Sequence, residues 1–361
     1  MRIVVIGAGV LGAAVAARLA SGGHGVTLID AKAPGSGTTG ASFSWINANE
    51  KVPRDYFDLN VAGMVAHCDG PWLHRTGRLQ WVAADADAER RALAKKDQRL
   101  RAWGYRVESL SAADARRLEP DVAIPDGVEV SFYPDEGFVW PAVYLAHLLD
   151  VALAAGAVLL PYAPVVRFLT AGGCVTGVEL ATGDRLEADV CVCCCGRWTQ
   201  EVAALADVHV PLLPAEDGSP VFGLLGVTAP VPTSVSRVVA SPRLNVRPDG
   251  AGRLLLHALD LDGAAQPDEA RASELLQRAG EIVPRAQGVH LDTVRVGARP
   301  LPADGRTVAG WAHGATGLYV LVTHSGITLA PLLAELTESE IAGGRDEPAL
   351  RPFRPERFAA V

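Results

Sequence analysis

Lysine is scarce in this sequence, and no segment of it is rich in basic residues. Only four of its 33 basic residues are lysines, and arginine supplies the others. The formal net charge is −8 over 361 residues. Because nucleic acids are bound through concentrated positive charge, this composition argues against a nucleic-acid partner.

Long hydrophobic runs are missing as well. No apolar stretch reaches the length of about 20 residues that a helix needs to cross a bilayer. Residues 1–20 combine a basic residue, an apolar run and alanines, as secretory signals do. Three glycines interrupt that run at fixed spacing, and a second apolar strand follows it directly, which favours a folded unit. We therefore expect a cytoplasmic protein.

Motifs for several other chemistries are absent. The sequence has neither the G-x-S-x-G turn nor a P-loop, and its histidines are scattered without metal-ligand spacing. Four of the six cysteines lie within residues 189–196, and no second pair elsewhere completes a metal site. Since cysteines this close along a strand rarely reach disulfide geometry, we expect small buried side chains and no bound metal.

The first thirty residues predict a strand, a helix and a second strand. Apolar residues 3–6 and 26–29 are the strands, and alanine-rich residues 10–21 are the helix. Between the first strand and the helix stands a G-x-G-x-x-G turn, formed by Gly7, Ala8, Gly9, Val10, Leu11 and Gly12. Such a turn brings a pyrophosphate to the amides and the positive dipole of a helix N-terminus.

An acidic residue, Asp30, follows the second strand. In dinucleotide-binding folds a carboxylate at this place bonds the ribose hydroxyls, and we assign the adjacent Ala31 and Lys32 to the same nucleotide. The glycine turn, its flanking strand and helix, and the acid together predict a bound dinucleotide. They do not distinguish NAD from FAD.

Strand and helix patterns continue along the rest of the chain. The predicted helices are residues 85–103, 111–118, 141–155, 268–283 and about 327–341. The predicted strands are residues 78–83, 127–139, 157–160 (buried), 252–257 and 318–322, with a meander over 165–190 and β-rich runs over 211–248.

The loop after the acid resembles a flavin-binding segment. Thr38-Thr39-Gly40-Ala41-Ser42-Phe43-Ser44-Trp45 is similar to the second flavin-binding stretch of the D-amino-acid oxidase superfamily, which includes glycine oxidase and sarcosine oxidase. In that family the Ala-Ser pair meets the pyrophosphate, and the residues after it run alongside the flavin ring. The resemblance implies FAD contacts from Thr39, Gly40, Ala41, Ser42, Ser44 and Trp45, and it places Asn47, Asn49 and Lys51 near the ring.

Later segments carry the same resemblance. Residues 297–305 match the family's Arg-Pro…Asp-Gly element, and residues 195–198 are similar to its Gly-x-Trp element. Residues 323–331 resemble the start of a helix whose N-terminus faces the flavin pyrimidine ring, where amides stabilise the negative charge of reduced flavin. The resemblance implies FAD contacts from Val166, Cys195, Gly196, Trp198, Arg299, Ser325, Gly326, Ile327 and Thr328.

The resemblance implies a two-domain α/β flavoprotein. Its FAD-binding domain is expected to be Rossmann-like, of the glutathione-reductase type, and discontinuous over residues 1–77, 140–212 and 290–361. A β-rich substrate-binding domain is inserted twice, as residues 78–139 and 213–289. This second domain is expected to pack over the flavin ring.

Three features depart from the family pattern. The loop between His324 and the following helix is two residues shorter than in many relatives. No cysteine lies within residues 301–307, where sarcosine oxidases attach flavin, so we expect non-covalent FAD. Residues 252–257 contain no lysine, whereas those enzymes use a lysine near the flavin for the reaction with oxygen. Oxygen and another electron acceptor are therefore both compatible with the sequence.

The activity implied by the resemblance is oxidation of the C–N bond of a small amine or amino acid. The α-hydrogen of the substrate would leave as hydride to flavin N5, and the resulting imine would hydrolyse. Three alternatives stay open: a 2-hydroxy acid in place of the amine, a NAD-dependent dehydrogenase that uses only the N-terminal unit, and a non-catalytic FAD-binding protein.

Three residues are candidates for catalysis or substrate contact. In glycine oxidase-like relatives the arginine that matches Arg299 holds the substrate carboxylate through a bidentate pair, although arginines before prolines are also common in turns. His257 would be either a proton-transfer group on a strand lining the site or a hydrogen-bonded core residue. His324 would either stabilise charge near the flavin or cap the helix that follows it.

Overall fold

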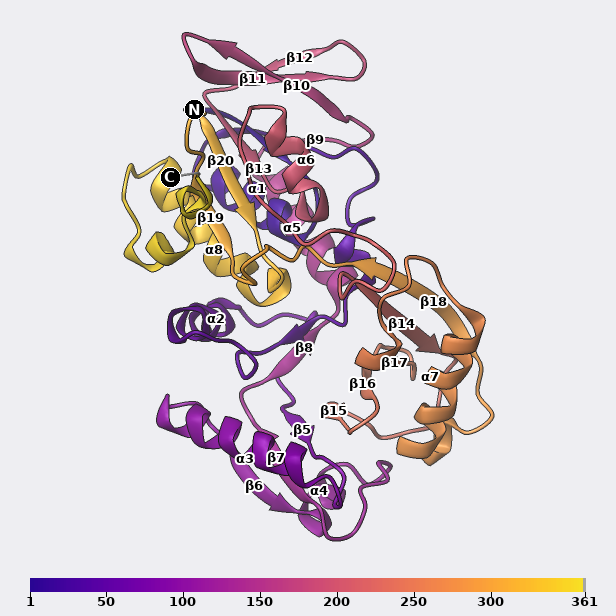
Figure 1. Cartoon of the computed structure of the whole chain (residues 1–361). Coiled ribbons are helices and arrows are strands. Elements are labelled where there is room, and N and C mark those ends of the chain that lie inside the picture. The colour runs from indigo at the N-terminus through magenta and orange to yellow at the C-terminus, as the bar shows by residue number, and fades with distance from the viewer. Residues whose placement is uncertain (360–361) are drawn as a thin grey trace.

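Two large sheets organise residues 1–359, which are the residues described by the computed structural model. A six-stranded sheet is the centre of the upper part of the molecule in Figure 1, and an eight-stranded sheet is the centre of the lower part. Two three-stranded sheets complete the β-structure of the described residues. Residues 360–361, the end of the predicted FAD-binding domain, lie outside the described residues.

The six-stranded sheet is parallel except at one edge. Its strands, in spatial order, are β19 (Val308–Trp311), β20 (Leu318–Val322), β13 (Val190–Cys193), β1 (Arg2–Ile6), β2 (Gly25–Ile29) and β9 (Val158–Leu160). β19 runs antiparallel to β20. Ile3 and Val5 of β1 enter the core on one face, whereas Val4 and Ile6 enter the core on the other. Burial on both faces explains why residues 3–6 of this strand are all apolar.

Helices cover one face of this sheet, and a small antiparallel sheet covers the other. The helices are α1 (Val10–Ser21), α5 (Pro141–Ala154) and α8 (Gly326–Ile341), with α1 packed against both α5 and α8; α2 (Arg54–Ala66) packs against α8. The core on the opposite face includes residues of β10 (Val165–Ala171), β11 (Cys174–Leu180) and α6 (Thr199–Ala204), and β12 (Arg185–Glu187) pairs with β11.

The predicted strand–helix–strand unit is present. α1 has the predicted bounds, and Gly22 follows its last residue. The meander expected over residues 165–190 is the β10–β11–β12 sheet. The six cysteines are all unpaired, and Cys191, Cys193 and Cys194 are buried, as their apolar surroundings predicted.

The eight-stranded sheet is built from two separate stretches of chain. Its strands, in spatial order, are β18 (Leu291–Ala298), β14 (Phe222–Thr228), β17 (Leu254–His257), β16 (Asn245–Pro248), β15 (Val238–Ala240), β5 (Arg78–Gln80), β7 (Glu129–Tyr133) and β6 (Glu108–Ser111). The parallel pair of β15 and β5 joins the two stretches. Helices α3 (Asp87–Ala102), α4 (Ala112–Leu118) and α7 (Glu269–Ile282) lie in this part of the molecule (Figure 1).

Two strand predictions are corrected by the structure. Residues 127–139 form two strands: β7 joins the large sheet, while β8 (Gly137–Val139) pairs with β3 (Trp45–Ile46) and β4 (Leu73–His74). Pro134 stands between them, and proline lacks the amide that a continuous ladder would use. The strand expected to be buried at residues 157–160 is the edge strand β9, where Val158 is 52% exposed.

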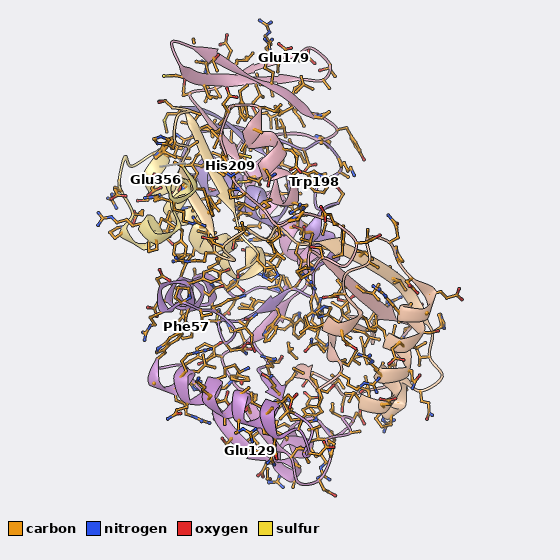
Figure 2. The ribbon with its side chains drawn as sticks, viewed as in Figure 1. Phe57, Glu129, Glu179, Trp198, His209 and Glu356 are labelled. Carbon is orange, nitrogen blue, oxygen red and sulfur yellow. The ribbon has the colours of Figure 1, made fainter. Side chains whose placement is uncertain are left out.

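Helix α2 has no counterpart among the predicted elements. It lies between the upper and lower parts, and its Phe57, labelled in Figure 2, packs on the rings of Trp103 and Tyr105 at centroid distances of 4.9 and 5.6 Å. Gly63 allows α2 to approach α8, because a Cβ there would lie 2.7 Å from the carbonyl oxygen of Thr328.

The sheets run across two of the predicted domain limits. β18 begins just after residue 290 but pairs with β14 in the eight-stranded sheet, and β8 ends at residue 139 but pairs with β3. The sheet to which each strand belongs is set by the strand it pairs with, and the spacing of residues in the sequence does not reveal that partner. The division into two domains stays a prediction. Within residues 1–359, no helix combines the length and apolarity that crossing a membrane demands.

A buried carboxylate, that of Glu136, links the three-stranded sheet of β3, β8 and β4 to its surroundings. Glu136, which is 0% exposed, accepts hydrogen bonds from Trp45 Nε1 at 2.8 Å, from Asn49 Nδ2 at 2.7 Å and from the Tyr105 hydroxyl at 2.8 Å. Burial raises the pKa of Glu136 to about 7, against the opposing effects of the Arg78 charge and the donated hydrogen bonds. The carboxylate is therefore partly protonated near neutral pH.

This pKa predicts a pH-dependent stability difference between the protein and its Glu136→Gln variant. The folded state holds the proton more tightly than the unfolded state, whose pKa is near 4.5. The stabilisation is therefore complete below pH 4.5 and is lost as the pH rises through 7. Between these limits the unfolding free energy of the wild type should fall by roughly 3 kcal/mol relative to the variant, which urea titrations at a series of pH values would measure.

The matched control is Glu129→Gln, which removes an exposed carboxylate from the neighbouring strand β7 (Figure 2). Stability curves for Glu136→Gln and the wild type that run parallel from pH 4.5 to 8 would contradict the assigned protonation of Glu136.

Candidate functional site

A cavity of about 770 Å³ is lined by residues of both large sheets. This volume is within the range of about 300–1,000 Å³ for ligand pockets. The lining includes Ile6 at the end of β1 and Val322 at the end of β20, together with Gly223 of β14 and His257 of β17. In open parallel sheets ligands bind outside the carboxyl ends of the strands, which is where this cavity lies.

The glycine turn forms one end of the cavity. Gly7 has a φ of +104°, a conformation that favours glycine, and a Cβ on Gly12 would lie 1.8 Å from the carbonyl oxygen of Gly7. A Cβ on Gly9 would project to within 3.2 Å of the Thr39 hydroxyl. Absence of these side chains brings the start of α1 close to the end of β1 and leaves the backbone accessible from the cavity.

Side chains hold this turn in place. Asp30 accepts hydrogen bonds from the amide of Ala8 at 2.7 Å and from the amide of Lys32 at 2.8 Å. The Thr39 hydroxyl accepts from the amide of Val10 at 3.1 Å. Asp30 and Thr39 thereby connect the second strand and the following loop to the N-terminus of α1.

A second helix N-terminus meets the same cavity. Ser325, Gly326, Ile327 and Thr328 at the start of α8 all line it. Ser325 makes a 2.9 Å hydroxyl–hydroxyl hydrogen bond with Tyr56, and its amide donates to the Thr323 hydroxyl at 3.1 Å. Two helix N-termini in one elongated cavity suit a ligand with negative charge at two places. A flavin dinucleotide has this character, with a pyrophosphate and an electron-rich ring, so the residues present fit FAD.

The structure brings most of the predicted site residues to this cavity. Of the predicted cofactor contacts, the cavity is lined by Gly7, Gly9, Val10, Leu11, Asp30, Ala31, Lys32, Thr39, Ala41, Ser42, Ser44, Trp45, Cys195, Gly196, Trp198, Arg299, Ser325, Gly326, Ile327 and Thr328. Figure 2 labels Trp198, which lies beside α6 and is 49% exposed. The three predicted catalytic residues, Arg299, His257 and His324, line it as well.

Three predicted contacts and one neighbouring residue lie elsewhere. Gly12 packs against Gly7, behind the turn, and the amide of Gly40 donates to Gly35 O at 2.9 Å inside its loop. Val166 is 48% exposed on β10, and Val165 lines the cavity in its place, since side chains alternate along a strand. Asn49 is turned toward Glu136.

Several lining residues were not among the predicted contacts. Arg197 lines the cavity, and its Nη1 is buried without a hydrogen-bond partner in the described residues, which marks a donor available to a ligand. It stands inside the predicted Gly-x-Trp element, so its position was a usable signal. Gly297 allows β18 to approach the loop of residues 38–45, because a Cβ there would lie 2.3 Å from Ala41 O. No sequence motif predicts that contact.

Three side chains form a cluster, here called the Arg299 cluster: His257 of β17, Asp262 in the segment after β17, and Arg299 directly after β18. Arg299 donates from Nη1 to Pro220 O at 2.8 Å and from Nη2 to Asp262 at 2.8 Å. His257 Nε2 lies 3.0 Å from Arg299 Nη2 and 3.2 Å from Asp262, so its tautomer decides which of the two it bonds. Burial opposes ionisation of Asp262, but the hydrogen bond with His257 and the charge of Arg299 outweigh it, so the pKa of Asp262 is lowered.

His324 faces the cavity between this cluster and α8. Its side chain is exposed to the cavity, yet the pKa of the imidazole falls to about 3. The main cause is removal from bulk water at this depth, and the positive charges of Lys51 and Arg299 add to it. His324 is therefore neutral at physiological pH.

Trp45 lines the cavity and is supported from behind by charged groups. Its indole nitrogen donates to Glu136, and the Arg78 guanidinium lies 3.9 Å from the centroid of its ring. A cation at this distance from an indole is an attractive contact. Within residues 1–359, no group of three or more His, Cys, Asp or Glu side chains is arranged to hold a metal ion.

Comparisons with known proteins agree with this geometry. The family described as FAD dependent oxidoreductase matches residues 2–339. A glycine oxidase of Geobacillus kaustophilus is 25% identical over 97% of this chain and 95% of its own. A D-amino acid dehydrogenase of Xanthobacter autotrophicus is 25% identical over 92% of this chain and 95% of its own.

A solved structure has the same fold. The crystal structure of glycine oxidase from Geobacillus kaustophilus superposes with a TM-score of 0.85 at 22% identity, covering 99% of this chain and 100% of that one. The predicted α/β fold and the predicted resemblance to the D-amino-acid oxidase superfamily are confirmed. The nicotinamide alternative is set aside, because the matched family uses FAD and the match covers far more than the N-terminal unit. The chain thus belongs to the family of FAD-dependent oxidoreductases, and its cofactor is FAD.

Proposed function

We propose that this oxidoreductase oxidises the C–N bond of a small amine or amino acid. The observation that carries the proposal is one continuous cavity lined both by the dinucleotide-binding turn and by His257 and Arg299 of the Arg299 cluster. The names of the relatives support it, since they are an amino-acid oxidase and an amino-acid dehydrogenase. A cavity blocked by side chains would have favoured a non-catalytic protein, and this cavity is open.

The nucleotide end of FAD would lie at the glycine turn, without a covalent bond to the chain. Amides at the start of α1 and the donor of Arg197 would bind the pyrophosphate, and Asp30 would bond the ribose. The start of α8 would face the flavin ring. FAD bound in this way supplies the acceptor for a hydride from the α-carbon of the substrate, whose nitrogen then forms an imine that hydrolyses.

The part of the cavity around His257, Arg299 and His324 would be the substrate side. His257 and His324 would orient the substrate and exclude water from it. His324, being neutral, can accept or donate one hydrogen bond without adding charge. Arg299 keeps His257 and Asp262 together as one rigid group.

The first test is whether an amine reduces the flavin. The purified protein should be yellow, and one or more members of a panel of D-, L- and N-methyl amino acids and simple amines should bleach its visible absorbance without oxygen. Admission of air would then decide between oxygen and another acceptor. A yellow protein that only 2-hydroxy acids bleach would overturn the proposed substrate class, and one that cannot be loaded with FAD would overturn the whole assignment.

Substitution of Gly12 by alanine should impair FAD binding. The new Cβ would collide with the carbonyl oxygen of Gly7 at 1.8 Å and displace the start of α1. Overpacking of this kind costs about 1–3 kcal/mol, so the Kd for FAD should rise about tenfold or more. The matched control is Gly25→Ala in the same unit, where the Cβ would meet Met1 O at an ordinary 3.7 Å. Equal FAD affinity in the two variants would contradict the role of the turn.

Replacement of His324 by alanine should slow flavin reduction without changing the shape of its pH profile. The loss of one neutral hydrogen bond costs about 0.5–1.5 kcal/mol, or about 2- to 10-fold in rate. The imidazole, with a pKa of about 3, does not titrate at higher pH. Anaerobic stopped-flow reduction measured from about pH 5 to 9 would test this. Disappearance of a limb near neutral pH in the variant would show that His324 titrates there.

A further inference from the structure

Arg299, the expected carboxylate-binding residue, is already engaged by the protein. Two of its nitrogens donate to Pro220 O and to Asp262, and the Asp262 side chain is only 8% exposed. The pair is close to neutral overall, and the Asp262 carboxylate would repel a second carboxylate beside it. A Cβ on Gly223 would lie 2.4 Å from Arg299 Nη2, so the guanidinium is also packed tightly against β14.

Lys51 is a second cation at the same cavity, and unlike Arg299 it forms no ion pair with a described residue. It lines the cavity, and among residues 1–359 no carboxylate oxygen lies within 4.0 Å of its ammonium. The acidic residues near it in the sequence are each paired with another cation: Glu50 with Lys96, Asp55 with Arg306 and Asp58 with Arg54. The ammonium of Lys51 therefore has no ion-pair partner among the described residues, and its charge acts on Glu50 only at longer range, where it adds to the effect of Lys96 in lowering the pKa of that carboxyl.

The position of Lys51 is beside the start of α8. Its ammonium lies 5.9 Å from the centroid of the Tyr56 ring, and the Tyr56 hydroxyl bonds Ser325, the N-cap of α8. Of the two cations that act on His324, Lys51 has the larger effect and Arg299 the smaller. Lys51 thus reaches the cavity from the segment before α2, whereas Arg299 reaches it from the segment after β18.

We propose that Lys51 binds the carboxylate of an amino-acid substrate and selects for it, while Arg299 stays paired with Asp262. The inference rests on the proposed function, because it names the group that would recognise the substrate. An ammonium offers three donors to a carboxylate, and such charge-assisted hydrogen bonds are stronger than neutral ones. An amine without a carboxylate would gain nothing from Lys51.

The test compares inert carboxylates with their neutral amides on the yellow holoprotein. Acetate, propionate and benzoate would be titrated against acetamide, propionamide and benzamide, with Kd values taken from changes in the flavin spectrum. Lys51→Met should raise the Kd of the carboxylates about 10- to 100-fold and leave the amides unchanged. Lys51→Arg should retain most of the affinity. Lys95→Met, on exposed α3, is the matched control and should behave as the wild type.

A double variant tests Arg299 without leaving a lone buried charge. Arg299→Met combined with Asp262→Asn removes both members of the pair and should change the carboxylate Kd less than about threefold if Lys51 is the binding group. Loss of carboxylate binding in the double variant would overturn the inference. The inference would also be overturned if Lys51→Met bound carboxylates as the wild type does, or if its only defect were slower reoxidation of the flavin by oxygen. A wild-type flavin spectrum that no carboxylate perturbs would overturn it as well.

Failure of this inference and failure of the proposed function give different results. If amino acids reduce the flavin, but Lys51→Met does not weaken the binding of amino acids relative to that of the corresponding amines, only the inference fails. If no amine or amino acid reduces the flavin, the proposed function fails, while the titration with carboxylates and amides still decides the role of Lys51.

Discussion

The contact between Gly7 and Gly12 is the constraint on which the rest of the site depends. Because no side chain fits between the Gly7 carbonyl and Gly12, helix α1 can begin directly at the end of β1. α1 then lies against α8, and both helices follow strands of the same parallel sheet. The carboxyl ends of parallel strands meet at one edge, so the two helix N-termini converge on one cavity. Two positive dipole ends in one place suit a cofactor that is negative at its pyrophosphate and becomes negative at its ring.

The second sheet completes this cavity through contacts with the loop that follows Asp30. Gly297 lets β18 approach Ala41, the Thr38 hydroxyl donates to Ala298 O at 2.5 Å, and Arg295 donates to Gly40 O at 2.9 Å. Glu136 supports the continuation of the same loop through Trp45 and Asn49. One loop is therefore held by backbone approach on one side and by a buried carboxylate on the other, so a change in either would move the residues expected beside the flavin.

Much of the fold and of the nucleotide end was predictable, because both are local in the sequence. The strand–helix–strand unit, the glycine turn and Asp30 lie within thirty residues, and the bounds of α1 match the prediction. Partners across long sequence separations were not predictable. β18 pairs with β14 and so belongs to the eight-stranded sheet, which the sequence did not indicate. Pro134 separates β7 from β8. The apolar spacing of α2 is interrupted by Arg, Asp and Asn, so the pattern did not predict this helix. The resemblance to glycine oxidase-like relatives implied that Arg299 holds a substrate carboxylate, but the sequence does not reveal that Asp262 lies beside it.

The two ends of the cavity differ in what they are made of, and this difference bears on how function changes in such a fold. The nucleotide end depends on glycines and backbone amides, where an added methyl group collides with the main chain. The proposed substrate side is lined by side chains from separate elements, such as Lys51 before α2 and Arg299 after β18. Side chains there can be exchanged without moving the backbone, and a charge can be cancelled by one new neighbour, as Asp262 does to Arg299. The glycine turn therefore constrains the sequence at few, local positions, whereas the proposed role of Lys51 would place substrate recognition on another cation while the fold stays the same.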